Sequence, residues 1–253
     1  MPVLLEAGAL TVRRGRRTVL SAVDLALDSA QAVHLAGANG SGKTSLLRVL
    51  AGIAAPRAGT LRRHGACAFV PEKVRLAPAL RGGEWLRAMR ALRGLTALDW
   101  PAAAESSGLD PAVLDRPAAT FSRGMLQRVA LLEAVHAGCP LLLLDEPFSG
   151  LDDDGRGWLA GRLSERLDCG AAVLLTDHSG AAAGRLALTG ALRLHDGRAA
   201  HAEPAAAAPT ARLTIRAAHP DGRRLERTVA EADGDDLLRD LLATGWHVRD
   251  VRR

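Results

Sequence analysis

The sequence predicts an α/β fold with a mainly parallel, buried sheet. Three observations support this prediction. A glycine-rich loop, "GANGSGKT" (residues 37–44), lies between a short apolar segment and a segment with helical spacing. Two further segments, "LLLLD" (141–145) and "AAVLLTDH" (171–178), are apolar until they end in polar residues, as strands buried on both faces do. Strand and helix patterns alternate along this part of the chain, which is typical of a parallel sheet.

The first 70 residues predict antiparallel strands that lead into the glycine-rich loop. "LEAGAL", "TVL" and "VDLALD" alternate apolar and polar residues, a pattern of strands with one solvated face. The densest basic run, "VRRGRR" (12–17), lies between the first two of these segments. Gly15 therefore predicts a hairpin turn within this run.

The glycine-rich loop fits the pattern G-x-x-x-x-G-K-[ST], which binds phosphate. Gly37, Gly40 and Gly42 let the backbone curl so that its N–H groups face phosphate oxygens at a helix N-terminus. Lys43 is expected to reach the β- and γ-phosphates, and the Thr44 hydroxyl is expected to bind Mg²⁺. The predicted nucleotide-binding residues of this loop are Gly37, Asn39, Gly40, Ser41, Gly42, Lys43, Thr44 and Ser45.

Residues 78–120 differ in character from the segments on either side. "GGEWLRAMRALRGL" and "PAAAESSGLDPAVLD" predict helices interrupted by glycine and proline. The strand pattern resumes with "CPLLLLDEP" (139–147), which ends in two carboxylates. Because ligands gather at the carboxyl ends of parallel strands, Asp145, Glu146 and His178 are expected at one edge of the sheet.

The two carboxylates suit different roles in phosphate chemistry. Asp145 is suited to bind Mg²⁺, directly or through water, and Glu146 is suited to the water molecule that attacks the γ-phosphate. The alternative is structural, because Asp-Glu-Pro can also open a helix with acidic residues in its first turn. The glycine-rich loop upstream favours the phosphate role.

Further motifs flank this carboxylate pair: "FSRGMLQRVALLEAV" (121–135) before it, then "FSGLDDDG" (148–155) and "LLTDHS" (174–179) after it. In this order the motifs resemble those of the nucleotide-binding subunits of ATP-binding-cassette (ABC) transporters, over roughly residues 3–197. The resemblance implies a P-loop NTPase fold of ABC type, with a parallel-sheet core, an antiparallel β subdomain and a helical subdomain at about residues 78–135. "FSRGMLQR" and "FVPE" (69–72) look most like the branch that serves ABC-2-type exporters.

The resemblance also implies a site shared between two chains. Ser122 and Gly124 would contact the γ-phosphate held by the phosphate loop of a second subunit, in a head-to-tail dimer. Asp152 would join the two sites across the interface. Glu146 would act as the general base or position the attacking water, and His178 would be the switch residue that contacts the γ-phosphate.

Three features depart from the family pattern. Glu72 lies where the family has a glutamine that touches Mg²⁺ and relays the nucleotide state, and a carboxylate can also bind this ion. The predicted metal ligands are thus Thr44, Glu72 and Asp145. Arg14 lies where the family has an aromatic ring under adenine, and its guanidinium plane is expected to lie on the base. In the signature, Arg123 and Met125 replace a glycine and a glutamine.

Charge and composition bear on the choice of partner. The net charge is +5, and Lys43 and Lys73 are the only lysines, so arginine supplies nearly all of the positive charge. Few aromatic residues accompany the basic runs, so nucleic acid is not the favoured partner. A solvated arginine surface is favoured, and attraction to an anionic membrane surface is an alternative.

The sequence carries no strong signal for export or membrane insertion of the chain itself. No apolar run approaches the ~18 residues that span a bilayer, and the start, "MPVLLEAGAL", lacks the basic head of a signal peptide. The three well-separated cysteines, Cys67, Cys139 and Cys169, favour neither a disulfide framework nor a zinc site. A reducing cytosol is the expected compartment.

An Ala/Pro-rich run, residues 198–211, is predicted to be a linker that bounds the main domain at 1–197. Beyond it, residues 212–253 predict a small α+β appendage with a hairpin turning at Asp221-Gly222, a helix and a closing strand, "WHVRDV". One face of this helix is expected to carry Leu237, Leu238, Leu241 and Leu242. A packing role is favoured over a regulatory ligand domain, because a unit of this size buries little core.

Together these features predict an ATPase subunit of a membrane transporter, with ATP and Mg²⁺ as cofactors and export as the favoured direction. The resemblance implies two partners: a multi-spanning permease, and a second ABC subunit in a homo- or heterodimer. The chain would then lie in the cytoplasm, peripheral at the inner face of the cell membrane. Two alternatives stay open at this point, a soluble ABC-type ATPase acting on ribosomes or DNA and an accessory binding module with little turnover.

Overall fold

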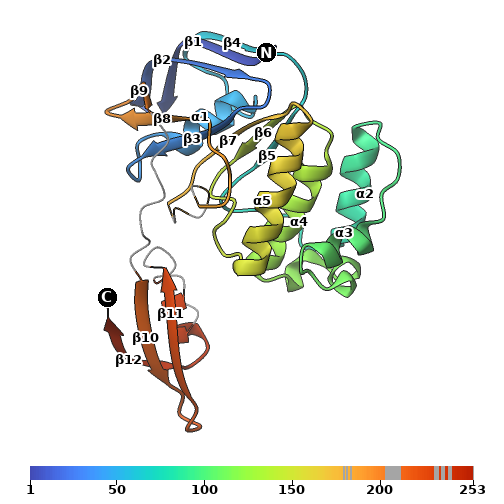
Figure 1. Cartoon of the computed structure of the whole chain (residues 1–253), viewed down its shortest axis with the longest axis vertical. Helices are drawn as coiled ribbons and strands as arrows, with labels where there is room; N and C mark the ends of the chain where they lie inside the picture. The colour runs from blue at the N-terminus through green and yellow to red at the C-terminus, as the bar shows by residue number, and fades with distance from the viewer. Residues whose placement is uncertain are drawn as a thin grey trace.

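The computed structural model describes residues 1–178, 180, 182, 184–202, 212–230, 234, 237, 238 and 241–252 (Figure 1). A six-stranded sheet lies at the centre, in the order β5-β6-β7-β3-β8-β9. Its first five strands run parallel and β9 runs antiparallel to β8. In sheet order these strands are β5 (Cys67–Val70), β6 (Leu141–Leu144), β7 (Ala172–Leu175), β3 (Ala32–Gly37), β8 (Gly190–His195) and β9 (Arg198–Ala202).

Alternate residues of β6 face opposite sides of this sheet. Leu142 and Leu144 join a core that includes helices α4 and α5, and Leu141 and Leu143 join a second core that includes helix α1. Each fully buried leucine contributes on the order of 2 kcal/mol to folding. This two-sided burial explains why β6 and β7 are apolar throughout. The three helices are α1 (Lys43–Leu50), α4 (Arg123–His136) and α5 (Asp153–Asp168).

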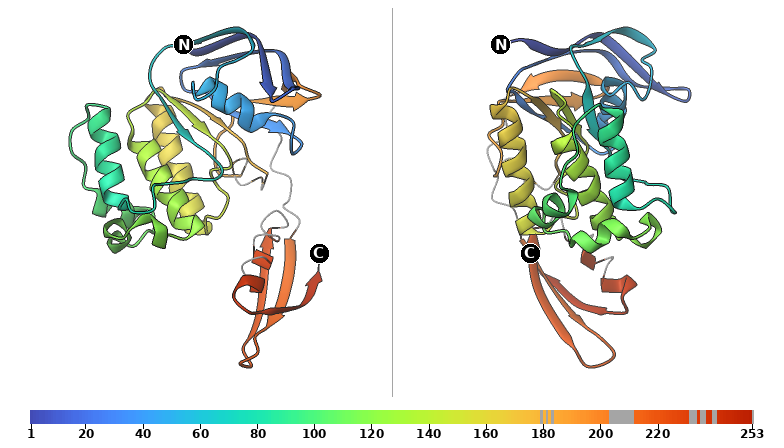
Figure 2. Two further views of the ribbon diagram at one scale, coloured as in Figure 1. Left: turned by 180° about the vertical axis from the view of Figure 1, so that it is seen from behind. Right: turned by 90° about the vertical axis from the view of Figure 1, so that its right-hand side faces the viewer.

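A three-stranded antiparallel sheet, in the order β2-β1-β4, packs on the α1 side of the central sheet (Figures 1 and 2). Gly15 adopts a φ of 61° in the turn between the first two strands, so the predicted hairpin is confirmed. Leucines and valines on one face of β1 and β2 are buried against α1 and β3. The strands are β1 (Val3–Arg14), β2 (Arg17–Asp28) and β4 (Ala58–Arg63).

A helical region lies beside α4 at the periphery (Figure 1). Its elements are α2 (Gly82–Leu92), α3 (Trp100–Ser106) and two short 3₁₀ turns, η1 (Pro111–Asp115) and η2 (Ala118–Thr120). Trp100 and Leu86 pack here against Leu132 of α4 in a separate small core. The predicted fold class is confirmed: a parallel-sheet core carries an antiparallel β subdomain and a helical subdomain.

The structure corrects the predicted start of the linker. Residues 198–202 are not linker but the edge strand β9, which pairs with β8 from His195↔Arg198 to Ala191↔Ala202. Backbone pairing of this kind requires no particular side chains, which is why an alanine-rich segment can close the sheet. The rest of the predicted linker, residues 203–211, lies outside the described residues.

The C-terminal residues form a second, small antiparallel sheet, in the order β11-β10-β12. Its strands are β10 (Arg212–Ala218), β11 (Arg224–Ala230) and β12 (His247–Arg252). The turn at Asp221-Gly222 matches the prediction, with Gly222 at a φ of 93°. Ile215, Ala217 and Leu241 form its buried core. Figure 2 shows this unit as a separate lobe at the C-terminal end of the chain.

One detail of the predicted C-terminal helix is wrong. Leu237 and Leu238 pack against the small core and Leu241 is buried, but Leu242 is 61% exposed. The helical residues end at 243 and a turn follows at Thr244 and Gly245, so Leu242 lies at the C-terminal end of the helix.

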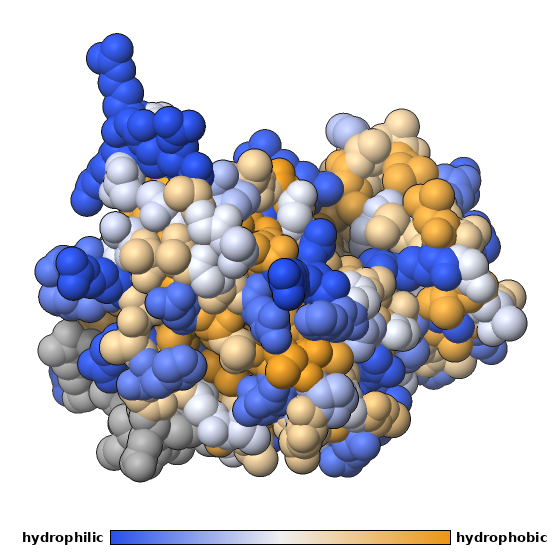
Figure 3. Space-filling model, turned by 90° about the horizontal axis from the view of Figure 1, so that it is seen from above, coloured by the Kyte–Doolittle hydropathy of each residue, from blue (hydrophilic) through white to orange (hydrophobic). Residues whose placement is uncertain are grey.

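Hydrophilic and hydrophobic side chains are interspersed on the face of the molecule seen in Figure 3. Within the described part of the chain, no helix is long and apolar enough to cross a bilayer.

Candidate functional site

The phosphate loop lies at the carboxyl end of β3, and two of its glycines are required by close packing. A Cβ on Gly37 would lie 2.7 Å from the carbonyl oxygen of Leu194, and Gly37 has a φ of 151°. A Cβ on Gly42 would lie 2.8 Å from Leu20 of β2, and Gly42 has a φ of 106°. Only glycine fits both the space and the backbone conformation. Helix α1 begins at the next residue, so its free N–H groups open into this loop.

Lys43 is held inside the loop by backbone carbonyls. Its ammonium group donates hydrogen bonds to the carbonyl oxygens of Gly37 at 2.6 Å and Ala38 at 3.2 Å, and the residue is only 8% exposed. Burial lowers the pKa of Lys43, although Glu146 and Asp145 act in the opposite direction. A bound polyphosphate would supply negative charge to this poorly solvated cation.

The loop is joined to the carboxyl end of β6 through a pair of side chains. The Thr44 hydroxyl donates a hydrogen bond to Oδ2 of Asp145 at 2.7 Å. Asp145 is 2% exposed, and its other oxygen, Oδ1, accepts a hydrogen bond from the Thr176 hydroxyl at 2.8 Å. The structure therefore brings together two of the three predicted metal ligands, Thr44 and Asp145.

Glu146 lies beside them in an unusual environment for a carboxylate. Its side chain is 13% exposed, and burial raises its pKa to about 7. Oε2 accepts a hydrogen bond from the backbone N–H of His178 at 3.1 Å. Oε1 lies 3.4 Å from Nε2 of His178. Burial, followed by the charge of Lys43, lowers the pKa of His178, which favours the neutral ring at pH 7.

Glu72, the third predicted metal ligand, lies at the same edge of the sheet but faces a different group. It follows β5 by two residues, and its Oε1 is 3.7 Å from the guanidinium of Arg123. Both side chains are about half exposed, so this ion pair contributes little to stability. Both members of this ion pair, Glu72 and Arg123, are positions at which the sequence departs from the family pattern.

Ser122, Gly124 and Asp152 lie at two adjacent helix starts. The Ser122 hydroxyl caps α4 by accepting from the Met125 N–H at 3.2 Å. Asp152 caps α5 by accepting from the Gly155 N–H at 2.8 Å, and the cap and the nearby Arg128 hold its pKa below the usual range. A Cβ on Gly124 would be 3.4 Å from the Gly150 carbonyl oxygen, so the two helix starts are in close contact.

Arg14 lies at the end of β1, directly across the hairpin from Arg17. The same hairpin approaches the phosphate loop at Leu20, next to Gly42. Arg14 itself is exposed. Asn39 and Gly40 are also exposed at the tip of the phosphate loop, whereas Ser41 and Ser45 are partly buried.

Two residues of this site escaped the sequence-based predictions. The first is Thr176, whose hydroxyl donates to Asp145 and accepts from the backbone N–H of Glu146 at 2.8 Å. Arg128 is 9% exposed and donates to Oδ1 of Asp152 at 2.6 Å and to the carbonyl of Ser107. One feature of the sequence points to Thr176: a hydroxyl residue directly follows an apolar strand, and the end of that strand lies beside the carboxylate pair.

The residues present fit a magnesium nucleotide. Among the described residues, buried Oγ of Ser41 and buried Oε1 of Glu146 have no hydrogen-bond partner, and buried polar atoms of this kind require one. The described residues contain no group of three or more His, Cys, Asp or Glu side chains suited to a metal ion. A Mg²⁺ ion at Thr44 and Asp145 would therefore depend on phosphate and water oxygens to complete its shell, as this ion usually does.

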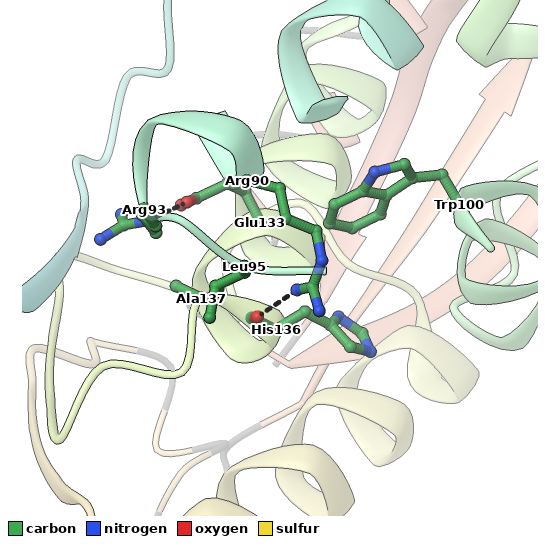
Figure 4. A pocket seen from close by; sticks show the side chains of 7 residues that line it. All are labelled: Arg90, Arg93, Leu95, Trp100, Glu133, His136 and Ala137. Atoms are coloured by element: carbon green, nitrogen blue, oxygen red, sulfur yellow. Dashed lines mark hydrogen bonds and ion pairs between the residues drawn. The ribbon is translucent and has the colours of Figure 1, made fainter. Parts of the chain in front are cut away.

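A separate hollow lies between α2, α3 and α4, lined by Arg90, Arg93, Leu95, Trp100, Glu133, His136 and Ala137 (Figure 4). Its two guanidinium groups already bind protein acceptors: Arg93 donates to Glu133 at 2.9 Å, and Arg90 donates to the carbonyl oxygen of His136 at 2.9 Å. This arrangement is structural, because it ties the end of α2 to α4.

The sequence matches the profile of the "ABC transporter" family over residues 20–149. It is 39% identical over 175 residues to "Cytochrome c biogenesis ATP-binding export protein CcmA" of Novosphingobium aromaticivorans, covering 69% of this chain and 88% of that protein. It is also 39% identical over 183 residues to "Zinc import ATP-binding protein ZnuC" of Alkalilimnicola ehrlichii, covering 69% of this chain and 68% of that protein.

Solved structures give the same fold. "Structure of ATP binding subunit of ABC transporter" superposes with a TM-score of 0.72 at 29% identity, covering 79% of this chain and 90% of that one. A dimeric ATP-binding cassette bound to ADP and Pi superposes with a TM-score of 0.70 at 19% identity, covering 79% of this chain and 98% of that one.

Proposed function

Since the chain belongs to the ABC transporter family and is one of its ATP-binding subunits, we propose that it hydrolyses MgATP to drive export through a membrane permease. One observation carries the proposal for the site. A continuous set of hydrogen bonds connects the phosphate loop at Thr44 to Asp145, Thr176 and Glu146. This set joins a phosphate-binding element to the backbone of a residue whose carboxylate is suited to act on water.

The phosphate loop would bind the triphosphate. The backbone N–H groups at the start of α1 face phosphate oxygens in such loops. Lys43 would exchange the carbonyl oxygens of Gly37 and Ala38 for phosphate oxygens, which restores a charged partner to a buried cation. Ser41 Oγ, which has no hydrogen-bond partner in the described part of the chain, would donate to the same phosphates.

Thr44 and Asp145 would hold Mg²⁺. The Thr44 oxygen can bind the ion through a lone pair while its hydroxyl still donates to Asp145, so the hydrogen bond in the structure need not break. When bound, the ion neutralises charge on the β- and γ-phosphates. Glu72 would join the metal shell only after leaving Arg123.

Glu146 would accept a proton from the attacking water. Its raised pKa, about 7, makes it a stronger base than an ordinary carboxylate while leaving about half of it ionised at neutral pH. His178 is held beside it through the backbone N–H bond to Oε2. The neutral His178 ring would orient the water or donate to the γ-phosphate.

Ser122, Gly124 and Asp152 would act on a second chain. Ser122, the N-cap of α4, is exposed, so this helix start is a suitable site for the γ-phosphate bound to the partner. The Asp152 side chain remains 64% exposed although Arg128 and Gly155 bind it, so it is accessible to the partner. This arrangement requires a head-to-tail pair of cassettes, and Arg14 would contribute the stacking surface for the base.

Export is the favoured direction because relatives named as export proteins match over 84–88% of their own length, and because the signature region resembles the exporter branch. The helical stretch at about residues 78–120 would face the permease at the inner side of the membrane. The comparisons give no support to the alternative of a soluble cassette acting on ribosomes or DNA.

The partner is tested by co-purification from native membranes with the protein tagged at its N-terminus. We expect a multi-spanning membrane protein to co-purify in stoichiometric amounts and to stimulate ATP hydrolysis when both are reconstituted in vesicles. Recovery of ribosomes or DNA in its place, with hydrolysis stimulated by them, would favour the soluble alternative.

A further inference from the structure

Thr176 is the first residue after β7, and it is fully buried. Its backbone N–H donates to the carbonyl oxygen of Leu144 at 3.0 Å, which extends the pairing of β6 and β7 by one residue. This backbone pairing therefore fixes the position of the Thr176 hydroxyl. Although Thr176 is buried, its oxygen does not face the apolar core alone: it contacts two functional groups just past the end of the neighbouring strand, β6.

The Thr176 hydroxyl is the donor of one hydrogen bond and the acceptor of another. It donates to Oδ1 of Asp145 at 2.8 Å and accepts from the backbone N–H of Glu146 at 2.8 Å. Asp145 is then held at both oxygens, because the Thr44 hydroxyl binds its Oδ2. A carboxylate held at both oxygens cannot rotate without breaking a hydrogen bond.

The backbone of Glu146 is in an unfavourable conformation, so it needs a hydrogen bond to hold it. It has a φ of 52°, a conformation that costs roughly 1–2 kcal/mol for a residue with a Cβ. The bond from its N–H to Thr176 holds the peptide in this conformation. The far end of Glu146 is held by the N–H of His178, two residues beyond Thr176, so the end of β7 fixes both its backbone and its carboxylate.

We propose that Thr176 is a positioning residue that fixes the carboxylate of Asp145 and the backbone of Glu146 relative to each other. The proposal rests on the proposed function, since Asp145 faces the metal site and Glu146 faces the attacking water. Thr176 itself would not touch the nucleotide. Its hydroxyl sets the spacing between two groups that must act together on one phosphate.

The test compares two substitutions at this position. Thr176→Val keeps the shape of the side chain but leaves Oδ1 of Asp145 and the N–H of Glu146 without their shared partner. Thr176→Ser keeps the hydroxyl. We expect the valine variant to lose about 10–100-fold in kcat, as changes to supporting hydrogen bonds at metal sites do, with KM for ATP changed less than about threefold. The serine variant should recover most of the loss.

A matched control is available in the same sheet. The Thr189 hydroxyl also bonds to backbone, at the N–H of Ala32 (3.1 Å), but at the opposite end of β3 from the phosphate loop. Thr189→Val should leave kcat unchanged. If Thr176→Val does not fold, Thr176→Ala takes its place with the same expectation.

A second measurement involves no turnover. Binding of Mn²⁺ to the ADP complex, followed by electron paramagnetic resonance, should weaken about tenfold in Thr176→Val and little in Thr176→Ser. Thermal midpoints of all variants establish that they are folded at the assay temperature.

The outcomes separate the positioning role from the proposed function. Wild-type kcat and Mn²⁺ affinity in a folded Thr176→Val variant would overturn the role of Thr176 and leave the ATPase assignment intact. A serine variant as impaired as the valine variant would also overturn it, because packing and not the hydroxyl would then matter. A wild-type protein that does not hydrolyse MgATP even with its partner would instead contradict the proposed function.

Discussion

The Thr44 hydroxyl donates a hydrogen bond to Oδ2 of Asp145 at 2.7 Å, although 101 residues separate the two in the sequence. The bond spans the carboxyl ends of β3 and β6, with β7 between them in the sheet. A loop that binds phosphate and a carboxylate suited to Mg²⁺ thereby share one edge, and Lys43 and Glu146, the residues next to them in sequence, lie at the same edge.

Lys43→Ala is expected to weaken ATP binding about 10–100-fold, because it removes a charge-assisted hydrogen bond to phosphate. Titration with a fluorescent ATP analogue measures the change. Lys73→Ala is the matched control, since Lys73 is the only other lysine and is exposed. Equal losses in both variants would show that the phosphate loop is not the binding site.

Glu146→Gln is expected to stabilise the nucleotide-free protein at high pH. The pKa of Glu146 is raised from 4.5 to about 7 by burial, so the folded state holds a proton that the unfolded state releases. Stability contributed by this group is present below about pH 4.5 and is lost as pH rises to about 7. Glutamine carries no charge at any pH and keeps an oxygen for the His178 N–H.

Urea unfolding at several pH values measures this effect. The difference in unfolding free energy between Glu146→Gln and wild type should be on the order of 2 kcal/mol at pH 8 and should shrink toward pH 5. A difference that is independent of pH would mean that the Glu146 carboxyl group titrates in the ordinary range.

Two truncated forms of the chain are expected to differ sharply in stability. Ending the chain after Ala202 should leave a folded protein that binds ATP, because β9 is then complete and the small C-terminal sheet has its own core. Ending it after Gly197 removes β9 and leaves β8 as an exposed edge, so the thermal midpoint should fall by several degrees more and aggregation should increase. Equal stability of the two truncated proteins would contradict a structural role for β9.

Arg14→Tyr is expected to tighten ATP binding by up to about tenfold, because an aromatic ring stacks on a base better than a hydrated guanidinium does. The wild type should discriminate weakly between ATP and GTP, since phosphate and Mg²⁺ contacts are common to both. Titration of both nucleotides against wild type, Arg14→Tyr and the control Arg16→Tyr measures this. A hundredfold preference of the wild type for ATP would mean that another group binds the base.

The sequence predicts those parts of the site that depend on local chemistry. The phosphate loop, the strand that ends in Asp145-Glu146 and the hairpin at Gly15 each lie within one continuous segment. Thr176 was missed because its role depends on β6 and β7 being neighbours, and helix α5 separates them in the chain. Arg128 was missed for the same reason, since its partner Asp152 is on another helix.

Two other sequence-based predictions, for residues 198–202 and for Leu242, were wrong for a different physical reason. The edge strand β9 contains alanine, arginine and histidine, which are weak strand signals, and it forms because β8 offers free backbone groups. Leu242 has the spacing of a buried helical residue but lies at the C-terminal end of the helix, where it is exposed.

Glu146 is expected to act on the water that attacks bound ATP. Steady-state hydrolysis by Glu146→Gln, with ATP binding measured in parallel, tests this role. Glutamine has the same shape but cannot accept the proton, so hydrolysis should fall about 10²–10⁴-fold while ATP binding stays within a few-fold of wild type. Glu165→Gln on the exposed side of α5 is the matched control and should hydrolyse ATP at the wild-type rate. Wild-type hydrolysis by a folded Glu146→Gln protein would show that Glu146 does not act on the attacking water.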